Sequence, residues 1–326
     1  MRNITKTHTG EIVSDTDLKL EYLFVGDYGK ENNIKADFLG YTKRIEIVEH
    51  RQVNLSDKLV VTVSSQKGCP MKCEFCDCPK FGFYGNASEA ELVSQITTAI
   101  ALSGVTSGER LNVHYARMGE PTLNPAVITS ACVIGELLRR TAQFKEYHPV
   151  VSTMMPKNHH KLYAFLEQWI YAGYEYGGDD GFGLQFSINT LDENERNKMF
   201  RNMSLSLAEI SDIIKRLPAP KKRKFTLNFA VTSKSNLDPT LMDKYFDKER
   251  CIVKITPIHE TKAAVSNGYE IVKDFDVYEQ FEKPLVDAGW DVIVFIPSQE
   301  EDSDRITCGN SLIALGGAKD DERKDN

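Results

Sequence analysis

From Leu59 onward, short runs rich in β-branched residues alternate with amphipathic stretches along the chain. Amphipathic stretches between such runs are typical of βα units, in which each helix covers one face of a parallel sheet. The pattern therefore predicts an α/β fold. The predicted strands lie at 59–65, 110–116, 150–153, 183–189, 224–232, 251–256 and 291–296.

Capping residues mark where the predicted helices begin. Ser88 and Glu91 have the spacing of a capping box, and Asn124 followed by Pro125 is typical of an N-cap and a first helical position. We expect helices at 88–103, 124–140, 158–172 and 205–216, and one more that begins at Asp238-Pro239.

No further βα unit follows Ile296, so an open barrel fits the pattern better than a closed eightfold one. The predicted fold class is a partial (βα)6-type barrel over residues 51–315. In such folds the functional residues lie in the loops that follow the C-terminal ends of the strands.

The first 50 residues have a different pattern. Segments 20–29, 35–41 and 44–50 resemble short strands joined by polar turns, which predicts a small β-rich appendage over residues 1–50. The charged, glycine-containing stretch 316–326 is expected to be a disordered tail.

Composition limits the classes of function. The 326 residues are 41% hydrophobic and carry 40 Lys and Arg against 47 Asp and Glu, a formal charge of -7. The chain therefore lacks the basic excess of a general phosphate-backbone binder, and any nucleic-acid contact must be local. No apolar run reaches the roughly 18 residues of a membrane span, and the polar start lacks a secretory signal, so we expect a cytoplasmic protein without membrane contact.

Four of the seven cysteines lie within ten residues, directly after the first predicted barrel strand. Cys69, Cys73 and Cys76 form a C-x3-C-x2-C pattern, which favours a [4Fe-4S] cluster whose fourth iron stays open for S-adenosylmethionine (SAM). The alternatives are a zinc site that also uses Cys78, or buried inert thiols. We interpret Cys78 as a bystander, because a fourth thiolate would close the iron that SAM needs.

Other strand ends carry residues that suit a SAM site. Gly119 would let the backbone approach a ligand, and Glu120 would accept a hydrogen bond from an ammonium group. Ser152 follows the third strand, and the hydroxyl and amide groups of Ser187-Ile188-Asn189 follow the fourth. Each of these residues has an alternative role in a turn or a helix cap.

The chain resembles the RlmN/Cfr radical SAM methyltransferases, which methylate adenosine in ribosomal and transfer RNA. The resemblance covers residues from about 45 to 315. It rests on five motifs: VSSQKGCPMKCEFC, MGEPTLN, SINTLDENERNKMFRN, KITPIHE and DSDRITCGN.

The resemblance implies that Cys308 receives a methyl group from one SAM and that a second SAM supplies the radical that acts on this methyl. A small buried residue is the alternative for Cys308. Glu46 matches the family's acidic residue, with a surface carboxylate as the alternative. His259 aligns with a SAM-contacting asparagine, and Thr62 stands where the family has a second redox cysteine, which a hydroxyl cannot replace.

The resemblance also implies a nucleotide or RNA substrate and a reductant such as flavodoxin or ferredoxin. The family has an N-terminal helical RNA-binding region, whereas about 50 residues precede the matched core here, which disfavours a large structured RNA. The basic residues 215–216 and 221–224 would grip a phosphate backbone or form a solvated loop. Two other functions stay open: a radical SAM enzyme that modifies a nucleotide or small metabolite without completing methyl transfer, and a zinc-binding structural protein.

Overall fold

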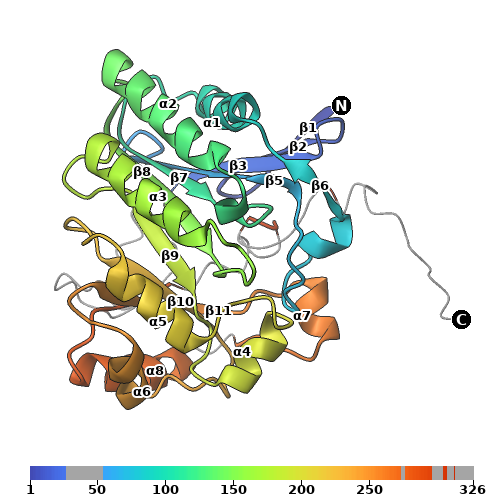
Figure 1. Ribbon diagram of the computed structural model, residues 1–326. Coiled ribbons are helices and arrows are strands. Elements are labelled where there is room, and N and C mark those ends of the chain that lie inside the picture. The colour runs from blue at the N-terminus through green and yellow to red at the C-terminus, as the bar shows by residue number, and fades with distance from the viewer. Residues whose placement is uncertain (27–53, 273–275, 296–303, 307–311, 313–326) are drawn as a thin grey trace, which may run out of the picture.

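One ten-stranded sheet organises the chain (Figure 1). The computed structural model describes residues 1–26, 54–272, 276–295, 304–306 and 312. Within them the strand order is β1-β2-β3-β4-β7-β8-β9-β10-β11-β12. Strands β1 to β4 pair antiparallel, and every pairing from β4 to β12 is parallel.

The strands of this sheet are β1 (Arg2–Lys6), β2 (Gly10–Asp15), β3 (Leu20–Gly26), β4 (Lys58–Val63), β7 (Gly108–Tyr115), β8 (Phe144–Thr153), β9 (Gly183–Ser187), β10 (Phe225–Val231), β11 (Cys251–Pro257) and β12 (Val292–Val294). A separate two-stranded sheet joins β5 (Gln66–Gly68) and β6 (Phe83–Asn86). The predicted α/β class with an open, partial barrel is confirmed.

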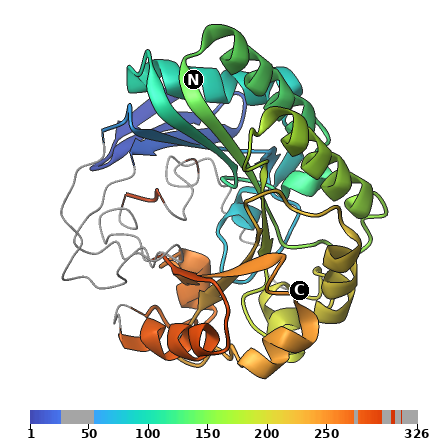
Figure 2. The same ribbon diagram turned by 90° about the vertical axis from the view of Figure 1, so that its left-hand side faces the viewer.

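Helices follow the parallel strands in turn. They are α1 (Glu89–Ser103), α2 (Ala126–Thr141), α3 (Leu162–Tyr176), α4 (Glu193–Met199), α5 (Leu207–Arg216), α6 (Pro239–Tyr245), α7 (Lys262–Ser266) and α8 (Asp276–Asp287). In Figure 2 the sheet curves, and α1, α2 and α3 lie along its convex side. None of the described helices is long and apolar enough to cross a membrane.

Side chains alternate between the two faces of the sheet. In β4, Leu59, Val61 and Val63 are buried in the large apolar core, whereas Val60 and Thr62 are only partly buried on the other face. Because successive side chains in a strand point to opposite faces, one face packs against helices and the other faces the inside of the barrel. The inner face is therefore where the strand ends can present polar groups.

The capping box at Ser88 is confirmed, since the Ser88 amide donates to Glu91 Oε2 (2.8 Å) and the Glu91 amide donates to Ser88 Oγ (3.2 Å). The prediction for α2 needs a correction. Pro125 is the N-cap, and Asn124 precedes it. The Asn124 side chain still accepts from the Ala126 amide (3.1 Å), but its own amide group donates to two backbone carbonyls of other loops.

Other element boundaries also differ from the predictions. Strand β8 begins at Phe144 rather than near 150, and α3 runs from Leu162 to Tyr176 rather than 158–172. The short helix α4 and the strands β1 and β2 are not among the predicted elements. Short elements of this kind have too few periodic positions to be distinguished from turns by sequence pattern alone.

The N-terminal strands extend the main sheet. β3 pairs antiparallel with β4, with Leu23 opposite Thr62, so the antiparallel region and the barrel share one set of hydrogen bonds. The strand predicted at 20–29 corresponds to β3. The strands predicted at 35–41 and 44–50 and the tail 316–326 lie outside the described residues.

Candidate functional site

The cysteine loop lies at the C-terminal edge of the parallel sheet, directly after β4 and β5. Its backbone is tied to two other segments: the Cys69 amide donates to Gly82 O (3.1 Å), and the Glu74 amide donates to Met199 O at the end of α4 (2.9 Å). Gly68 precedes the loop with φ 83°, and a Cβ there would lie 1.8 Å from Gly82 O. Only glycine fits this close approach of two backbones.

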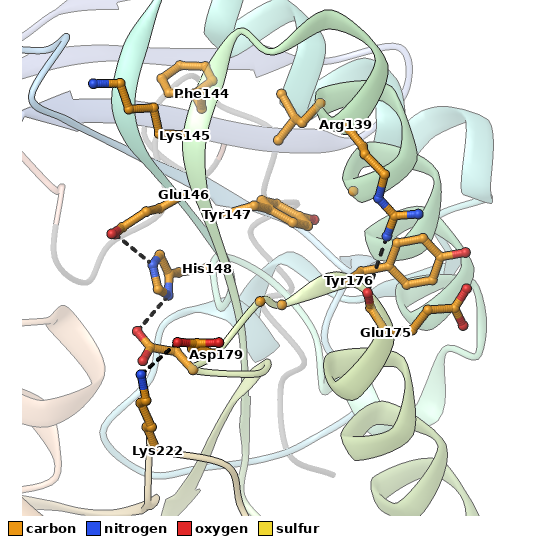
Figure 3. Close-up of a pocket in the computed structure, with 15 residues that line it drawn as sticks. Arg139, Phe144, Lys145, Glu146, Tyr147, His148, Glu175, Tyr176, Asp179 and Lys222 are labelled. Carbon is orange, nitrogen blue, oxygen red and sulfur yellow. Dashed lines mark hydrogen bonds and ion pairs between the residues drawn. The ribbon is translucent and has the colours of Figure 1, made fainter.

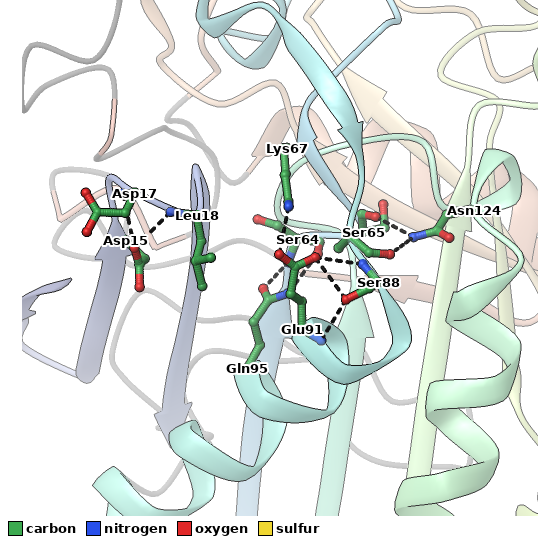
Figure 4. A network of polar contacts seen from close by, with 11 residues as sticks. Asp15, Asp17, Leu18, Ser64, Ser65, Lys67, Ser88, Glu91, Gln95 and Asn124 are labelled. Carbon is green, nitrogen blue, oxygen red and sulfur yellow. Dashed lines mark hydrogen bonds and ion pairs between the residues drawn. The ribbon is translucent and has the colours of Figure 1, made fainter. Parts of the chain in front are cut away.

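Polar side chains from α1 and from the segment before α2 fix the start of this loop (Figure 4). The Ser64 amide donates to Gln95 Oε1 (2.9 Å), and Gln95 Nε2 donates back to Ser64 O (3.1 Å). Asn124 Nδ2 donates to Ser65 O (2.7 Å). These bonds satisfy backbone groups that leave the sheet ladder, so the strand end is held in one conformation before the cysteines begin.

The three thiols predicted as iron ligands are partly buried and free. Burial raises the pKa of Cys69 to about 12, and the nearby Cys76 raises it further. Burial also raises the pKa of Cys73 well above its usual range, with the charges of Cys76 and Cys69 adding to the effect. The three sulfur atoms are therefore close enough to repel one another as thiolates, and a bound cation would relieve this repulsion.

The donor set suits an iron–sulfur cluster. Among the described residues, no three His, Cys, Asp or Glu side chains gather as they would around one metal ion. Each thiolate of a cubane cluster binds a different iron atom, so its ligands need not converge on one point. The loop offers three thiols, one for each of three irons, as the sequence predicts.

Cys78 lies in an apolar cluster with Phe81, Met118 and Leu312, and Cys69 and Cys76 pack against that cluster. Its sulfur donates to Arg117 O (3.6 Å). A hydrogen bond from the Cys78 side chain is the main cause that lowers the pKa of Cys76. Cys78 is therefore a buried neighbour of the predicted ligands, and its role as a bystander stays a prediction.

Glu120 is buried and already has hydrogen-bond partners. Its Oε1 accepts from the amide (3.2 Å) and hydroxyl (2.7 Å) of Thr122, and its Oε2 accepts from the Met154 amide (3.0 Å). Burial raises the pKa of Glu120. Hydrogen bonds from Thr122, Met154 and the Thr153 side chain oppose this shift. Four donors therefore face the roughly four acceptor positions of the carboxylate, and the contact of Glu120 with an ammonium group stays a prediction.

Gly119 is required by its surroundings. Its φ is 98°, and a Cβ there would lie 2.6 Å from Gln66 Cβ. Gln66 Oε1 in turn accepts from the Glu120 amide (2.8 Å). The glycine therefore allows Gln66 to hold the Glu120 backbone, a role that the sequence analysis did not foresee beside the predicted approach to a ligand.

The residues predicted at the ends of β8 and β9 fall into two groups. Within the described ranges, the hydroxyls of Ser152 and Ser187 make no hydrogen bond, and their predicted contact with a ligand stays a prediction. Ile188 is part of the apolar core. Asn189 has a φ of 65°, and its Oδ1 accepts from the Ala230 amide (3.3 Å). Ile188 can therefore offer a ligand only its backbone, and the Asn189 side chain also has a structural role.

Two further predicted residues lie in the described part of the chain. His259 follows β11, in a segment joined to the cysteine loop because Thr261 Oγ1 donates to Phe75 O (2.7 Å). Thr62 lies in β4 in register with His114 of β7. Glu46 and Cys308 lie outside the described residues, so their predicted roles stay predictions.

Sequence reasoning missed Arg196 of α4. This side chain is 1% exposed, and its Nη1 donates to the carbonyls of Ser187 and Ile188. Burial lowers the pKa of Arg196 to about 9. The residue fixes the backbone that presents Ser187. The arginine in the SINTLDENERNKMFRN motif was a possible signal of this role, because a guanidinium group has five N–H donors and can bond to several carbonyls at once.

A cavity of about 560 Å³ lies at the opposite end of the sheet, beside the first half of β8 (Figure 3). Four of its ionisable side chains form two pairs. Glu146 Oε2 lies 3.1 Å from His148 Nε2, and Lys222 Nζ lies 2.6 Å from Asp179 Oδ2. The motif residues lie at the other strand ends, so this cavity is separate from the candidate site.

The described fold matches that of a crystal structure of a radical SAM methyltransferase from Sphaerobacter thermophilus. The match has a TM-score of 0.59 at 16% identity and covers 92% of this chain and 78% of that one. At this identity the match establishes the fold. The class that the fold defines is therefore the open, partial α/β barrel seen in that structure.

In sequence, the chain is similar to curated RNA methyltransferases. It is 28% identical over 237 residues to the "Dual-specificity RNA methyltransferase RlmN" of Wolinella succinogenes, and 26% identical over 223 residues to that of Aliarcobacter butzleri. These alignments cover 72% and 68% of this chain, and the chain spans 61% and 57% of the relatives' own lengths. No protein-family model matches. The chain is a distant homologue of the RlmN methyltransferases over most of its length.

Proposed function

We propose that this protein is a radical SAM methyltransferase that holds a [4Fe-4S] cluster on Cys69, Cys73 and Cys76. The observation that carries the proposal is the position of three free, partly buried cysteines directly after β4 and β5, at the C-terminal edge of a parallel sheet whose fold matches that of a radical SAM methyltransferase. When bound, a cluster and SAM supply one-electron reductive chemistry to this edge. A cytoplasmic reductant such as flavodoxin or ferredoxin would provide the electron.

The chain's own residues bind and orient the cofactor in this proposal. The three thiols hold the cluster, and Glu120 accepts a hydrogen bond from the SAM ammonium group. The hydroxyls of Ser152 and Ser187 donate to SAM carboxylate or ribose oxygens, and Arg196 fixes the Ser187 backbone by donating to its carbonyl. His259 and the backbone around Asn189 complete the polar wall.

For the methyl transfer we propose Cys308 as the carrier and a purine-like base in RNA or a nucleotide as the acceptor. The proposal rests on the DSDRITCGN motif and on the names of the RlmN relatives. Glu46 is the proposed acidic residue of the reaction.

The basic run gives little support to a phosphate grip. Lys221 Nζ donates to the carbonyls of Tyr174 and Gly178, and Lys222 pairs with Asp179. Lys224 Nζ lies 2.8 Å from Asp291 Oδ2. Because these ammonium groups already have partners, we propose that recognition of the substrate uses the C-terminal edge of the sheet instead.

A second candidate function is a radical SAM reaction on a nucleotide or small metabolite that does not complete methyl transfer. The observation that favours it is Thr62 of β4, a hydroxyl residue at the position where the resemblance implies a second redox cysteine. Without a thiol at this position, a covalent adduct between Cys308 and a base has no resolving group there.

The experiment is anaerobic incubation of the full chain with methyl-labelled SAM, followed by mass analysis of the Cys308 peptide. We expect one labelled methyl group on Cys308 without substrate and none in Cys308→Ala. In the presence of an adenosine-containing RNA, Thr62→Cys should raise the release of methylated product. An unlabelled Cys308, together with unchanged product formation by Cys308→Ala, would refute the methyl-carrier proposal and favour the second function.

A further inference from the structure

Arg196 of α4 is a buried cation that bonds to neutral groups. Its Nη1 donates to the carbonyls of Ser187 (2.8 Å) and Ile188. Its Nη2 donates to Ser204 Oγ, and this hydroxyl donates in turn to Met154 O (2.6 Å). In the part of the chain that the structure describes, no Asp or Glu oxygen lies within ion-pair distance of the guanidinium. The positive charge is therefore held by dipoles and not by a counter-ion.

A second buried arginine shows the contrast. Arg117 is 7% exposed, and its Nε donates to Glu21 Oε1 (2.6 Å), so its charge is neutralised inside the protein. A buried charge without such a partner is costly. Burial lowers the pKa of Arg196 to about 9, and the nearby Glu193 and Cys73 partly oppose this shift. Arg196 therefore stays protonated at neutral pH and keeps a positive charge that no ion pair neutralises.

The Arg196 guanidinium lies beside the cysteine loop. Its Cζ is 4.7 Å from the centroid of the Phe200 ring, and this ring packs edge-on against Phe75, with 5.7 Å between centroids. Phe200 also belongs to an apolar cluster against which Cys73 packs. A backbone hydrogen bond ties the loop to the end of α4. Because the side chains in this contact are apolar, water screens the charge of Arg196 only weakly on the side of Cys73.

We propose that the buried charge of Arg196 raises the reduction potential of a cluster held by Cys69, Cys73 and Cys76. This inference rests on the proposed cluster. One-electron reduction adds a negative charge to a thiolate-ligated cluster, so a fixed cation nearby favours the reduced form. The potentials of such clusters depend on net charge, on hydrogen bonds to sulfur and on solvent exposure. Arg196 acts here through its charge, without contact to an iron atom, and makes the cluster easier for a one-electron donor to reduce.

The test compares the midpoint potential of the cluster in full-length variants, followed by electron paramagnetic resonance during an anaerobic dithionite titration without SAM. Arg196→Gln removes the charge but keeps an amide donor, whereas Arg196→Lys keeps the charge on a different donor group. Ser204→Asp leaves the arginine in place and puts a carboxylate beside its Nη2. The matched control is Lys198→Gln, which removes a cation from the exposed side of the same helix.

In Arg196→Gln and Ser204→Asp we expect the midpoint potential to fall by about 59 mV or more. This shift is a tenfold change in the ratio of reduced to oxidised cluster for a one-electron couple. Arg196→Lys should stay close to wild type because the charge remains. Lys198→Gln should also stay close, because solvent screens an exposed charge. Each variant should keep about four irons per chain, the content of one cubane cluster.

A wild-type potential in both Arg196→Gln and Ser204→Asp would overturn the inference. So would an equal fall in Arg196→Gln and Arg196→Lys, because the effect would then come from lost hydrogen bonds. If only one of the two charge-neutralising variants holds its cluster, the potential of that variant decides. Loss of iron from both would also overturn the inference, because Arg196 would then support the loop and not the potential. Wild-type protein that binds no cluster would instead refute the proposed function.

Discussion

Ionisable side chains have different surroundings at the two ends of the parallel sheet. At the N-terminal end, beside the first half of β8, Arg110 Nε lies 2.7 Å from Glu146 Oε2, and His148 lies near both Glu146 and Asp180. At the C-terminal end, the pKa values of Cys69 and Cys73 are raised because burial and the nearby Cys76 disfavour their charged forms.

This difference indicates which end of the sheet would bind a cationic cofactor. Paired charges satisfy one another and need nothing further, which is typical of structural surface networks. The charged forms of buried groups that repel one another are unfavourable until a bound cation stabilises them. The cysteine end is therefore the end at which substitutions should change cofactor content, and the paired end should tolerate them.

The largest expected effect is the loss of the cluster. Cys73→Ala removes one of three proposed iron ligands, so anaerobically purified protein should lose its brown colour and most of its iron, against about four irons per chain in wild type. Cys132→Ala, in α2, is the matched control and should keep both. Iron analysis and visible absorbance provide the measurement. A bleached Cys78→Ala protein beside a coloured Cys73→Ala protein would show that the ligands are assigned wrongly.

A smaller effect is expected at Glu120. Glu120→Gln keeps the shape of the side chain but removes the charge that would bind the SAM ammonium. Losing such a charge-assisted hydrogen bond costs about 1.5–3 kcal/mol, so the Kd for SAM should rise about ten- to hundredfold. Glu146→Gln, at the paired end, is the control and should leave the Kd unchanged. Equal SAM affinity in wild type and Glu120→Gln, measured by equilibrium dialysis, would exclude the proposed contact.

The smallest effect concerns pH and two histidines. Burial lowers the pKa of His114 to about 3, and the surrounding charges of Lys254, Arg223 and Lys58 add to this shift. The unfolded chain binds the proton near pH 6.5, so His114 destabilises the fold progressively as pH falls from about 6.5 toward 3. The slope is at most about 1.4 kcal/mol per pH unit.

The variants His114→Asn and His148→Asn separate the two environments. Urea unfolding at pH 7 and pH 5 should show a smaller loss of stability on acidification in His114→Asn than in wild type. His148→Asn should change this loss less, because Glu146 and Asp180 partly offset the lowering of the His148 pKa by burial. Identical pH dependence in wild type and His114→Asn would contradict the lowered pKa of His114.

Much of the fold was predictable because its signals are local. The alternation of apolar runs and amphipathic stretches located every parallel strand of the sheet from β4 to β12. The capping box at Ser88 and the Asp238-Pro239 start of α6 depend on residues within one helical turn, so sequence alone places them. The x3-x2 spacing of the cysteines is likewise a property of the chain.

Contacts between distant segments were not predictable from these patterns. The side chain of Asn124 bonds to the loops around Ser65 and Ala87, and this contact accompanies the shift of the α2 cap to Pro125. The basic run at 221–224 reads as a candidate phosphate grip, but its lysines pair with groups such as Asp179 and Asp291 far along the chain.

The sequence by itself determined that this chain forms βα units and presents three cysteines after a strand, because strand period, helix caps and ligand spacing are set by neighbouring residues. Only the tertiary structure decided which charges meet. It joined Glu21 to Arg117 and both to residues on either side of Cys308, contacts that span 96, 189 and 291 positions of the sequence. Such partners are chosen by strand pairing and burial, which no local pattern of residues encodes.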